Sequence, residues 1–373
     1  MNKLYTAIGL MSGTSGDGID ASIIQSDGEK RINIVSNHYC EYEDEIKNEI
    51  IALKRKINNP KDLKTWSNEI DFLEKKITVL HINFVLKILK ETKNLEAYNG
   101  VDVLGFHGQT IYHNANEKIS KQMGDGLLLS KSTRLNTVFN FRRKDLLNGG
   151  QGAPLTPIYH KLIYENLNLS YPVVFVNIGG ISNITFISKE NKIISFDSGP
   201  GNILIDRFIQ NKSNDKIKYD KDGEIALKGN YNEILLENYL NNPFFEIEPP
   251  KTLDTNDFSL SIIRGLTFEN SVTTLSELTA RTIVDSLNFL KQKPKKIILC
   301  GGGRKNKFLF NRIKNLSKIE TISIDEERID GDFVESQAFA YLAVRTLTEK
   351  PISFPETTGV KFPCVCGELI KFK

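Results

Sequence analysis

The chain opens on the sequence LYTAIGLMSGTSGDGIDASII, which occupies residues 4–24. Residues 4–10 and 19–24 are apolar and rich in β-forming side chains, whereas residues 11–18 are rich in Ser, Gly, Thr and Asp, which favour turns. The stretch therefore predicts a β-hairpin closed by a glycine-rich loop. The backbone amides and hydroxyls of such a loop can converge on an anion such as a phosphate. For this stretch alone, a plain hairpin turn is the alternative.

The loop differs from a Walker A motif, because the Gly-Lys-Ser/Thr ending is missing and a strand follows where that motif has a helix. Glycine matters here because a side chain would hold a phosphate away from the backbone. The loop residues whose backbone amides can converge on the phosphates are Gly13, Thr14, Ser15, Gly16, Asp17 and Gly18. Asp17 and Asp20 are candidates to hold a phosphate-bound Mg²⁺ through water, which is how proteins usually bind that ion.

The same pattern recurs later in the chain. Residues 172–178, 184–187 and 193–196 read as strands, and Gly179-Gly180 begins the first turn between them. A strand–glycine turn–strand unit thus occurs twice, about half a chain apart, which indicates two related halves facing each other across a cleft. A further strand, residues 296–300, opens into a third glycine site and then a helix. The glycines of the two later sites are Gly179, Gly180, Gly301, Gly302 and Gly303.

The remaining segments complete an α/β chain. Apolar residues recur every three or four positions over residues 62–91, which predicts one long amphipathic helix or two joined helices. Residues 32–38 and 101–106 read as strands, and a strand near residues 362–372 is expected to return to the N-terminal half.

Asp197 follows a predicted strand and precedes a Gly-Pro-Gly loop. A carboxylate in that position can face a cleft and take a proton from a nucleophile. The alternative is an Asx-turn or a helix cap, a common use of Asp.

Two more polar clusters are candidates for a ligand site. His107-Gly108-Gln109-Thr110 comes directly after a predicted buried strand, although such a histidine can equally be structural. Arg142, Arg143 and Lys144 precede the glycine-rich residues 149–154 and could clamp an anion. A charged helix end on the surface is the alternative for that cluster.

Composition narrows the class of protein. The chain has 373 residues, so two domains are expected. Its net charge of +3, without a basic block, does not indicate nucleic-acid binding. No apolar run approaches the roughly 18 residues of a membrane span, and the N-terminus lacks a signal-peptide cleavage site. Four cysteines without a zinc-ligand pattern predict free thiols and a cytoplasmic protein.

Taken together, these segments resemble the anhydro-N-acetylmuramic acid kinase family, which has the actin/hexokinase/Hsp70-like ATPase fold. The matches run in family order from residue 8 to about residue 343. They are residues 13–20, 107–110, 141–143, 149–155, 177–180, 197–202, 219–223 and 300–303.

The resemblance implies that ATP is used to open the 1,6-anhydro ring of anhydro-N-acetylmuramic acid with water and to phosphorylate its 6-oxygen. The products would be N-acetylmuramic acid 6-phosphate and ADP, in peptidoglycan recycling. The family's aspartate that matches Asp197 activates the water. The nucleotide loop extends through Ile19 and Asp20, and a homodimer is implied. The resemblance implies sugar contacts from His107, Gln109, Arg142, Arg143, Gly199 and Asn202.

The chain departs from the family at several positions. Gly16 stands where the family usually has leucine, and Asn140 and Lys144 stand where it has aspartate and arginine. Pro250-Lys251-Thr252 fits the family, but residues 253–256 do not match its usual Gly-Arg-Glu stretch.

We predict an α/β protein with a two-domain actin-like ATPase (ribonuclease H-like) fold and a central cleft. The first domain would comprise residues 1–138 with about 350–373, and the second residues 139–349. Two alternatives stay open on the residues alone. One is another sugar kinase of the same fold, and the other is a non-enzymatic actin-like or Hsp70-like ATPase.

Overall fold

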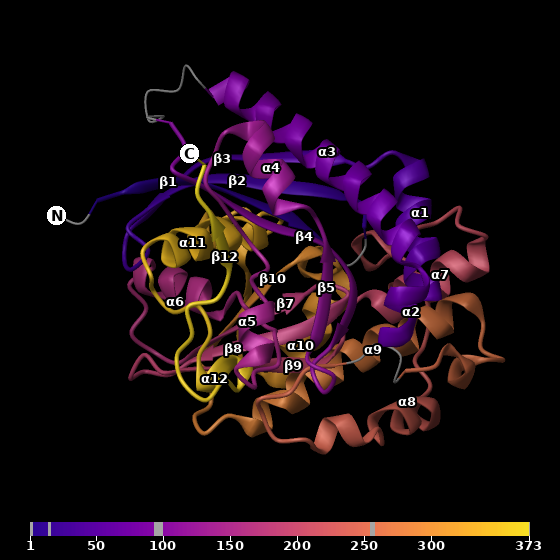
Figure 1. Cartoon of the computed structure of the whole chain (residues 1–373). Helices are drawn as coiled ribbons and strands as arrows, with labels where there is room; N and C mark the ends of the chain where they lie inside the picture. Colours follow the sequence, from indigo (N-terminus) through magenta and orange to yellow (C-terminus); the bar gives the residue numbers. More distant parts are fainter. Residues whose placement is uncertain (1–2, 14–15, 93–99, 254–257, 373) are drawn as a thin grey trace. The chain divides into compact units, whose positions relative to one another are not determined.

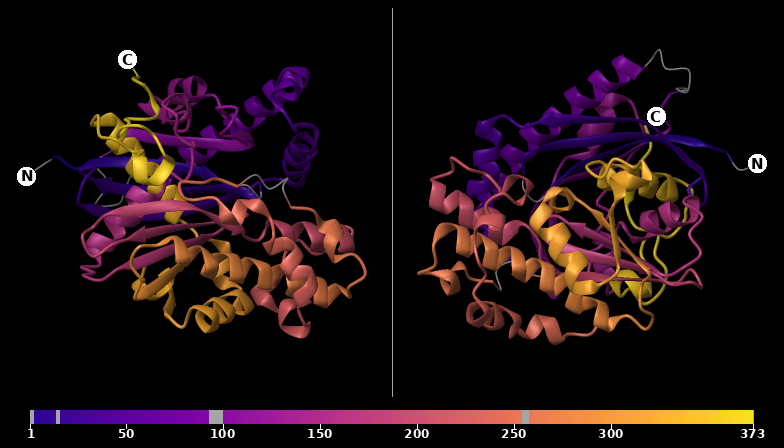
Figure 2. Two further views of the ribbon diagram at one scale, coloured as in Figure 1. Left: turned by 90° about the horizontal axis from the view of Figure 1, so that it is seen from below. Right: turned by 180° about the vertical axis from the view of Figure 1, so that it is seen from behind.

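The computed structural model describes residues 3–13, 16–92, 100–253 and 258–372 (Figures 1 and 2). The predicted nucleotide contacts of Thr14 and Ser15 lie outside the described residues. The chain forms two compact units, one of Met1–Asn166 with Phe333–Lys373 and one of Leu167–Asp332. Residues 139–166 and 333–349 belong to the first unit, whereas the predicted bounds place them in the second domain.

The first unit is built on a mixed sheet of seven strands among the described residues. The strand order is β3-β2-β1-β4-β6-β12, with β5 paired to β4. β1 is antiparallel to β2 and parallel to β4, so the predicted hairpin is confirmed. The predicted return of the C-terminal segment is also confirmed, because β12 pairs with β6. The strands are β1 (Tyr5–Ser12), β2 (Gly18–Ser26), β3 (Ile32–Glu41), β4 (Val103–Asn114), β5 (Ile119–Met123), β6 (Thr137–Phe139) and β12 (Glu368–Ile370).

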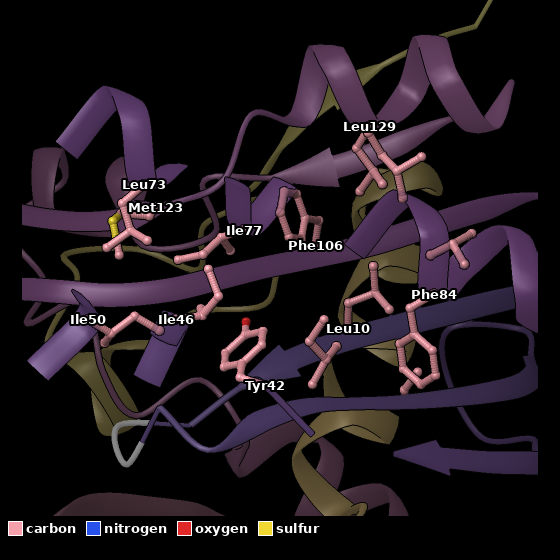
Figure 3. Packing of buried hydrophobic residues seen from close by; sticks show 14 of the residues in the cluster. Leu10, Tyr42, Ile46, Ile50, Leu73, Ile77, Phe84, Phe106, Met123 and Leu129 are labelled. Carbon is pink, nitrogen blue, oxygen red and sulfur yellow. The ribbon is translucent and has the colours of Figure 1, made fainter. Parts of the chain in front are cut away.

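Helices cover this sheet. α11 contacts β1, β2 and β4 at close range, because Gly9 and Gly105 leave room for the helix backbone at Ser336 and Phe339. A second group of helices buries an apolar core that includes Leu10, Ile77 and Phe106 (Figure 3). Each such buried side chain contributes about 1.5–3 kcal/mol. The helices of this unit are α1 (Asp44–Lys56), α2 (Pro60–Thr65), α3 (Ser67–Thr92), α4 (Gly126–Thr133), α5 (Arg143–Leu147), α6 (Pro157–Asn166), α11 (Val334–Leu347) and α12 (Pro355–Thr358).

The second unit repeats this topology. Its described strands form one five-stranded sheet in the order β9-β8-β7-β10-β11. β7 is antiparallel to β8 and parallel to β10, which reproduces the pattern of β1 with β2 and β4. This duplicated α/β topology confirms the predicted repeat and the predicted actin-like, ribonuclease H-like fold class. The strands are β7 (Val173–Ile178), β8 (Ile181–Ile187), β9 (Ile193–Pro200), β10 (Lys296–Cys300) and β11 (Glu320–Ser323).

Two helices pack on this second sheet and close its core. α9 contacts β8 and β9, and α10 contacts α9 and β11. The side chain of Asn306 accepts a hydrogen bond from the Leu309 amide, which caps α10 directly after the third glycine site. The helices of this unit are α7 (Ile203–Ser213), α8 (Glu233–Leu240), α9 (Phe268–Ser286) and α10 (Lys307–Ser317), with 3₁₀ turns at Lys221–Gly223, Ala226–Lys228, Pro243–Glu246, Leu260–Ile263, Leu287–Phe289, Gly302–Lys305 and Ile324–Glu327.

Two strands continue through polar residues that were predicted to follow them. His107, Gly108, Gln109 and Thr110 lie within β4 and not after it, because β4 continues in antiparallel pairing with β5. β9 likewise runs on through Pro200, where it pairs with β8. The expectation that these polar residues stand outside the sheet was wrong for both segments. The helical pattern of residues 62–91 is confirmed as two helices, α2 and α3.

Among the described residues, no helix combines the length and the apolar character needed to cross a membrane.

Candidate active site

Asp197 lies near the end of β9 and is buried. Asn183 pairs with Asp197 and Ser182 pairs with Gly199, so Ser198 is the extra residue of a β-bulge. Bulges commonly re-aim a side chain next to a functional site. The backbone amide of Asp197 donates to the Lys251 carbonyl (3.0 Å), and its Oδ2 accepts from the Leu253 amide (2.9 Å). These contacts fix the orientation of the carboxylate.

The alternative role of Asp197 as a helix cap does not fit this geometry. α7 begins at Ile203, and its N-cap residue is Asn202. Asp197 stands within the strand five positions earlier. A buried, oriented carboxylate at a strand end can accept a proton from a nucleophile.

Lys251 is a neighbour of Asp197 whose role the sequence did not reveal. Its Nζ lies 3.1 Å from the Phe244 carbonyl oxygen and 4.3 Å from the centre of the Phe289 ring. Burial lowers the pKa of Lys251 to about 8, although the carboxylates of Glu248 and Asp197 act in the opposite direction. A charged side chain in an apolar site of this kind is unusual. Perturbed pKa values cluster at functional sites, so Lys251 supports the assignment of a functional site at Asp197.

The turn at Gly179 and Gly180 adjoins the segment that follows Asp197. The Asn202 amide donates to the Gly179 carbonyl (2.8 Å), and the Gly201 amide donates to the Gly180 carbonyl (3.0 Å). The Asn202 side chain donates to the Ile178 carbonyl (3.3 Å). The structure therefore brings a predicted nucleotide turn and a predicted sugar contact together in the second unit.

The third glycine site lies beside this turn. Asn177 pairs with Cys300, so the turns that follow the parallel strands β7 and β10 leave the sheet at the same edge. Ligands of α/β sheets commonly bind at that edge. A Cβ atom at Gly301 or Gly303 would collide with Asn177 or Ile178, whereas nothing lies within 4 Å of a Cβ built at Gly302. Gly302 thus presents open backbone, as close approach of a ligand requires.

Arg304 holds this turn in place. Its guanidinium donates to both carboxylate oxygens of Asp325 (2.6 and 3.0 Å) and to Asp332 (2.7 Å). It also donates to the Gly301 carbonyl (3.1 Å). The Arg304 side chain is buried, and its forked contacts tie the turn to Asp325 and Asp332.

In the first unit, the predicted nucleotide loop is tied to β4. The Gln109 side chain donates to the Gly13 carbonyl (2.8 Å), and the Gly16 amide also donates to it (3.1 Å). Gly16 has φ +69°, a conformation that costs a leucine energy, so this chain's departure from the family residue matches its local backbone.

The rest of the loop places its side chains in different surroundings. Asp17 is exposed and Asp20 is half-buried, whereas Ile19 packs in the core of the unit. A Cβ at Gly18 would collide with Tyr39 and with the backbone of Cys40, so packing against β3 by itself requires glycine there.

In the first unit, the buried side chain of His107 is hydrogen-bonded to the half-buried side chain of Arg142. Arg142 donates through Nε (3.2 Å) and Nη2 (3.0 Å) to His107 Nε2 and through Nη1 to the Gly152 carbonyl (2.7 Å). Because arginine only donates, His107 Nε2 accepts, and its Nδ1 donates to the Gly108 carbonyl (2.8 Å). Burial, aided by the Arg142 guanidinium, lowers the pKa of His107 well below its usual range. The imidazole is therefore neutral.

Arg143 has different surroundings. Its side chain is 66% exposed and pairs with Glu368 at 3.1 Å, so its guanidinium faces solvent.

Glu335, at the start of α11, is a further titratable group near Arg142 that the sequence analysis did not single out. Burial raises the pKa of Glu335, and the charge of Arg142 opposes that shift.

Comparisons of the sequence with a family model and with known proteins agree on one family. A family model described as anhydro-N-acetylmuramic acid kinase matches residues 5–371. A protein of that name from Pelagibacter ubique (strain HTCC1062) is 48% identical to this chain and spans 100% of both chains. Another, from Zymomonas mobilis, is 38% identical and covers 97% of this chain and 99% of its own length. Among solved structures, a ROK family glucokinase from Streptomyces griseus in complex with glucose and AMPPNP matches with a TM-score of 0.42 and 11% identity, over 91% of this chain and 99% of its own.

Proposed function

Since the chain belongs to the anhydro-N-acetylmuramic acid kinase family, we propose that it is an ATP-dependent phosphotransferase that converts 1,6-anhydro-N-acetylmuramic acid to N-acetylmuramic acid 6-phosphate. This reaction belongs to peptidoglycan recycling. The observation that carries the proposal is the family match over residues 5–371. The fixed and buried carboxylate of Asp197 supports it, because ring opening needs a base.

We assign the base to Asp197. Its carboxylate takes a proton from water, and the water oxygen bonds to the anomeric carbon as the bond from that carbon to the 6-oxygen breaks. The freed 6-oxygen then attacks the γ-phosphorus of ATP, and ADP leaves. The hydrogen bond from the Leu253 amide keeps one carboxylate oxygen of Asp197 in place. The proton is therefore transferred to a base of fixed geometry.

Nucleotide binding is assigned to the glycine sites. The backbone is open at Gly302 and at Gly179. The nearest described atom to a Cβ built at Gly179 is the Ile181 oxygen, at 3.6 Å. This open backbone supports close approach of phosphates or ribose. For the loop of residues 13–20, we propose phosphate contacts through backbone amides. The carboxylates of Asp17 and Asp20 are hard oxygen ligands suited to Mg²⁺ held through water, and that ion offsets phosphate charge when bound.

An assay of ADP release tests the proposal. With 1,6-anhydro-N-acetylmuramic acid, ADP should form at a rate that depends on the sugar concentration. Glucose and N-acetylglucosamine should leave the rate at the background of ATP hydrolysis. Equal rates with glucose would support an ordinary sugar kinase. A rate independent of any sugar would support an actin-like or Hsp70-like protein that hydrolyses ATP to change shape.

Arg143 is proposed to bind the lactyl carboxylate of the sugar. Within the part of the chain that the structure describes, its exposed guanidinium makes a surface ion pair with Glu368, a contact worth at most about 1 kcal/mol. Arg143→Ala should therefore raise KM for the sugar about tenfold or more, leave KM for ATP near its normal value and hardly change the melting temperature. Steady-state kinetics with each substrate varied in turn give both constants.

A matched variant separates this role from support of the fold. Arg142→Ala removes the donors to His107 and Gly152 and should lower the melting temperature. Equal changes of both KM values in Arg143→Ala would place Arg143 at the phosphates or in the fold instead.

We further propose that the protein acts in the cytoplasm as a homodimer, as the resemblance implies. Sedimentation equilibrium tests the dimer, and fractionation of cells tests the location.

A further inference from the structure

We propose that Lys251 is a positioning residue for the reaction, because it anchors the segment that orients the Asp197 carboxylate and holds a positive charge within electrostatic reach of it. The inference rests on the proposed role of Asp197 as the base. Lys251 itself is assigned no contact with either substrate.

The ammonium of Lys251 is bound inside the protein. The residue is 4% exposed, and its Nζ lies 3.1 Å from the Phe244 carbonyl oxygen and 3.4 Å from that of Phe245. The same atom lies over the rings of Phe289 (4.3 Å), Phe244 (4.7 Å) and Phe196 (5.9 Å). Carbonyl oxygens and aromatic faces both attract a cation. The side chain therefore has one defined place.

The backbone of the same segment holds Asp197. The Lys251 carbonyl accepts from the Asp197 amide, and the Leu253 amide donates to Asp197 Oδ2. These two hydrogen-bond partners of Asp197 belong to residues 251–253, next to the anchored side chain. A displacement of Lys251 moves the donor that fixes the carboxylate.

The positive charge of Lys251, like its position, favours the role of Asp197 as a base. Burial lowers the pKa of Lys251 to about 8, with Glu248 and Asp197 opposing the shift. The two carbonyl oxygens and the aromatic faces around Nζ stabilise the ammonium form. A cation near a carboxylate favours its ionised form, which is the form a base needs.

Retaining a charge in this apolar site is costly for the fold. An ammonium gives up hydration when it is buried, and an apolar side chain of similar shape is often as stable or more stable in such a place. Methionine has a similar unbranched, apolar chain and suits a site lined by aromatic rings. The cost is explained if the ammonium serves the reaction.

Lys251→Met tests the inference with separate readouts for catalysis and stability. We expect kcat to fall roughly tenfold, KM for ATP to stay unchanged, and the melting temperature to stay the same or rise. Lys296→Met is the matched control, because Lys296 is also a largely buried lysine of the second unit, paired with Glu320 at 3.1 Å. It should leave kcat unchanged. An unchanged kcat in Lys251→Met, at any melting temperature, would overturn the inference.

A double-mutant cycle tests whether Lys251 acts through Asp197. In the Asp197→Asn background, Lys251→Met should lower kcat by much less than it does in the wild type, since the base is already absent. The same fold loss in both backgrounds would show that Lys251 acts elsewhere and would overturn the inference. The two assignments fail separately: near-normal activity of Asp197→Asn removes the proposed base, whereas an inactive Asp197→Asn with a normal Lys251→Met removes only the role of Lys251.

Discussion

Asp197→Asn is expected to lower kcat at least ~100-fold, the lower end of what a general base contributes. Asparagine keeps the shape of the side chain, and its amide oxygen can still accept from the Leu253 amide. The variant should therefore fold and bind ATP almost as the wild type does. What it loses is the ability to take a proton from water. Steady-state kinetics, a thermal melt and ATP titration on this variant check the three expectations.

The control for this variant is Asp27→Asn. Asp27 is also buried, and it accepts hydrogen bonds from the amides of Glu29, Lys30 and Arg31. Burial by itself raises the pKa of Asp27, but these contacts and the Arg31 side chain outweigh it and lower the pKa to about 2, so the ionised form supports the fold. Asp27→Asn should lower the melting temperature and leave kcat intact. Near-normal turnover in Asp197→Asn would contradict the assigned mechanism.

Gly302→Val is expected to weaken ATP binding at least about tenfold, which is about 1.4 kcal/mol, without unfolding the protein. Among the described residues, no atom lies within 4 Å of a Cβ built at Gly302, so a valine side chain has room there. It would, however, stand where the nucleotide has to approach the backbone. Calorimetric titration with ATP, alongside a thermal melt, measures both effects.

Gly265→Ala controls for general destabilisation of the same unit. Gly265 has φ +98° and open space around its Cβ, so alanine there is strained by roughly 1 kcal/mol without any collision. That variant should melt earlier and bind ATP normally. Unchanged ATP affinity in Gly302→Val would show that the third glycine site does not contact the nucleotide.

The strands and helices were predictable wherever periodicity and turn residues act locally. The hairpin of β1 and β2 follows from two apolar runs around a Gly/Ser/Thr/Asp loop, and its antiparallel register places Leu10 opposite Ala21. The ends of β4 and β9 were not predictable. Polar residues such as Gln109 break the apolar pattern, yet pairing with a neighbouring strand continues through them. Strand ends depend on the partner strand, which local sequence does not specify.

The candidate site divides in the same way. Asp197 and the glycine turns could be proposed from the sequence because glycine and a carboxylate at a strand end carry chemistry in their own sequence context. Lys251 and Arg304 could not, since their importance comes from burial among Phe244 and Phe289 or against Asp325. A lysine or arginine on a loop usually faces solvent, and only the tertiary structure shows that these two do not.

The mass of the sugar product tests the central claim most directly. After a short incubation with ATP and 1,6-anhydro-N-acetylmuramic acid in ¹⁸O-labelled water, the account predicts a product that has gained one phosphoryl group and one water. The label should lie on the anomeric carbon, because the 6-oxygen comes from the opened ring and carries the phosphate. A phosphorylated product that retains the anhydro ring, or release of ADP with the sugar unchanged, would contradict the account.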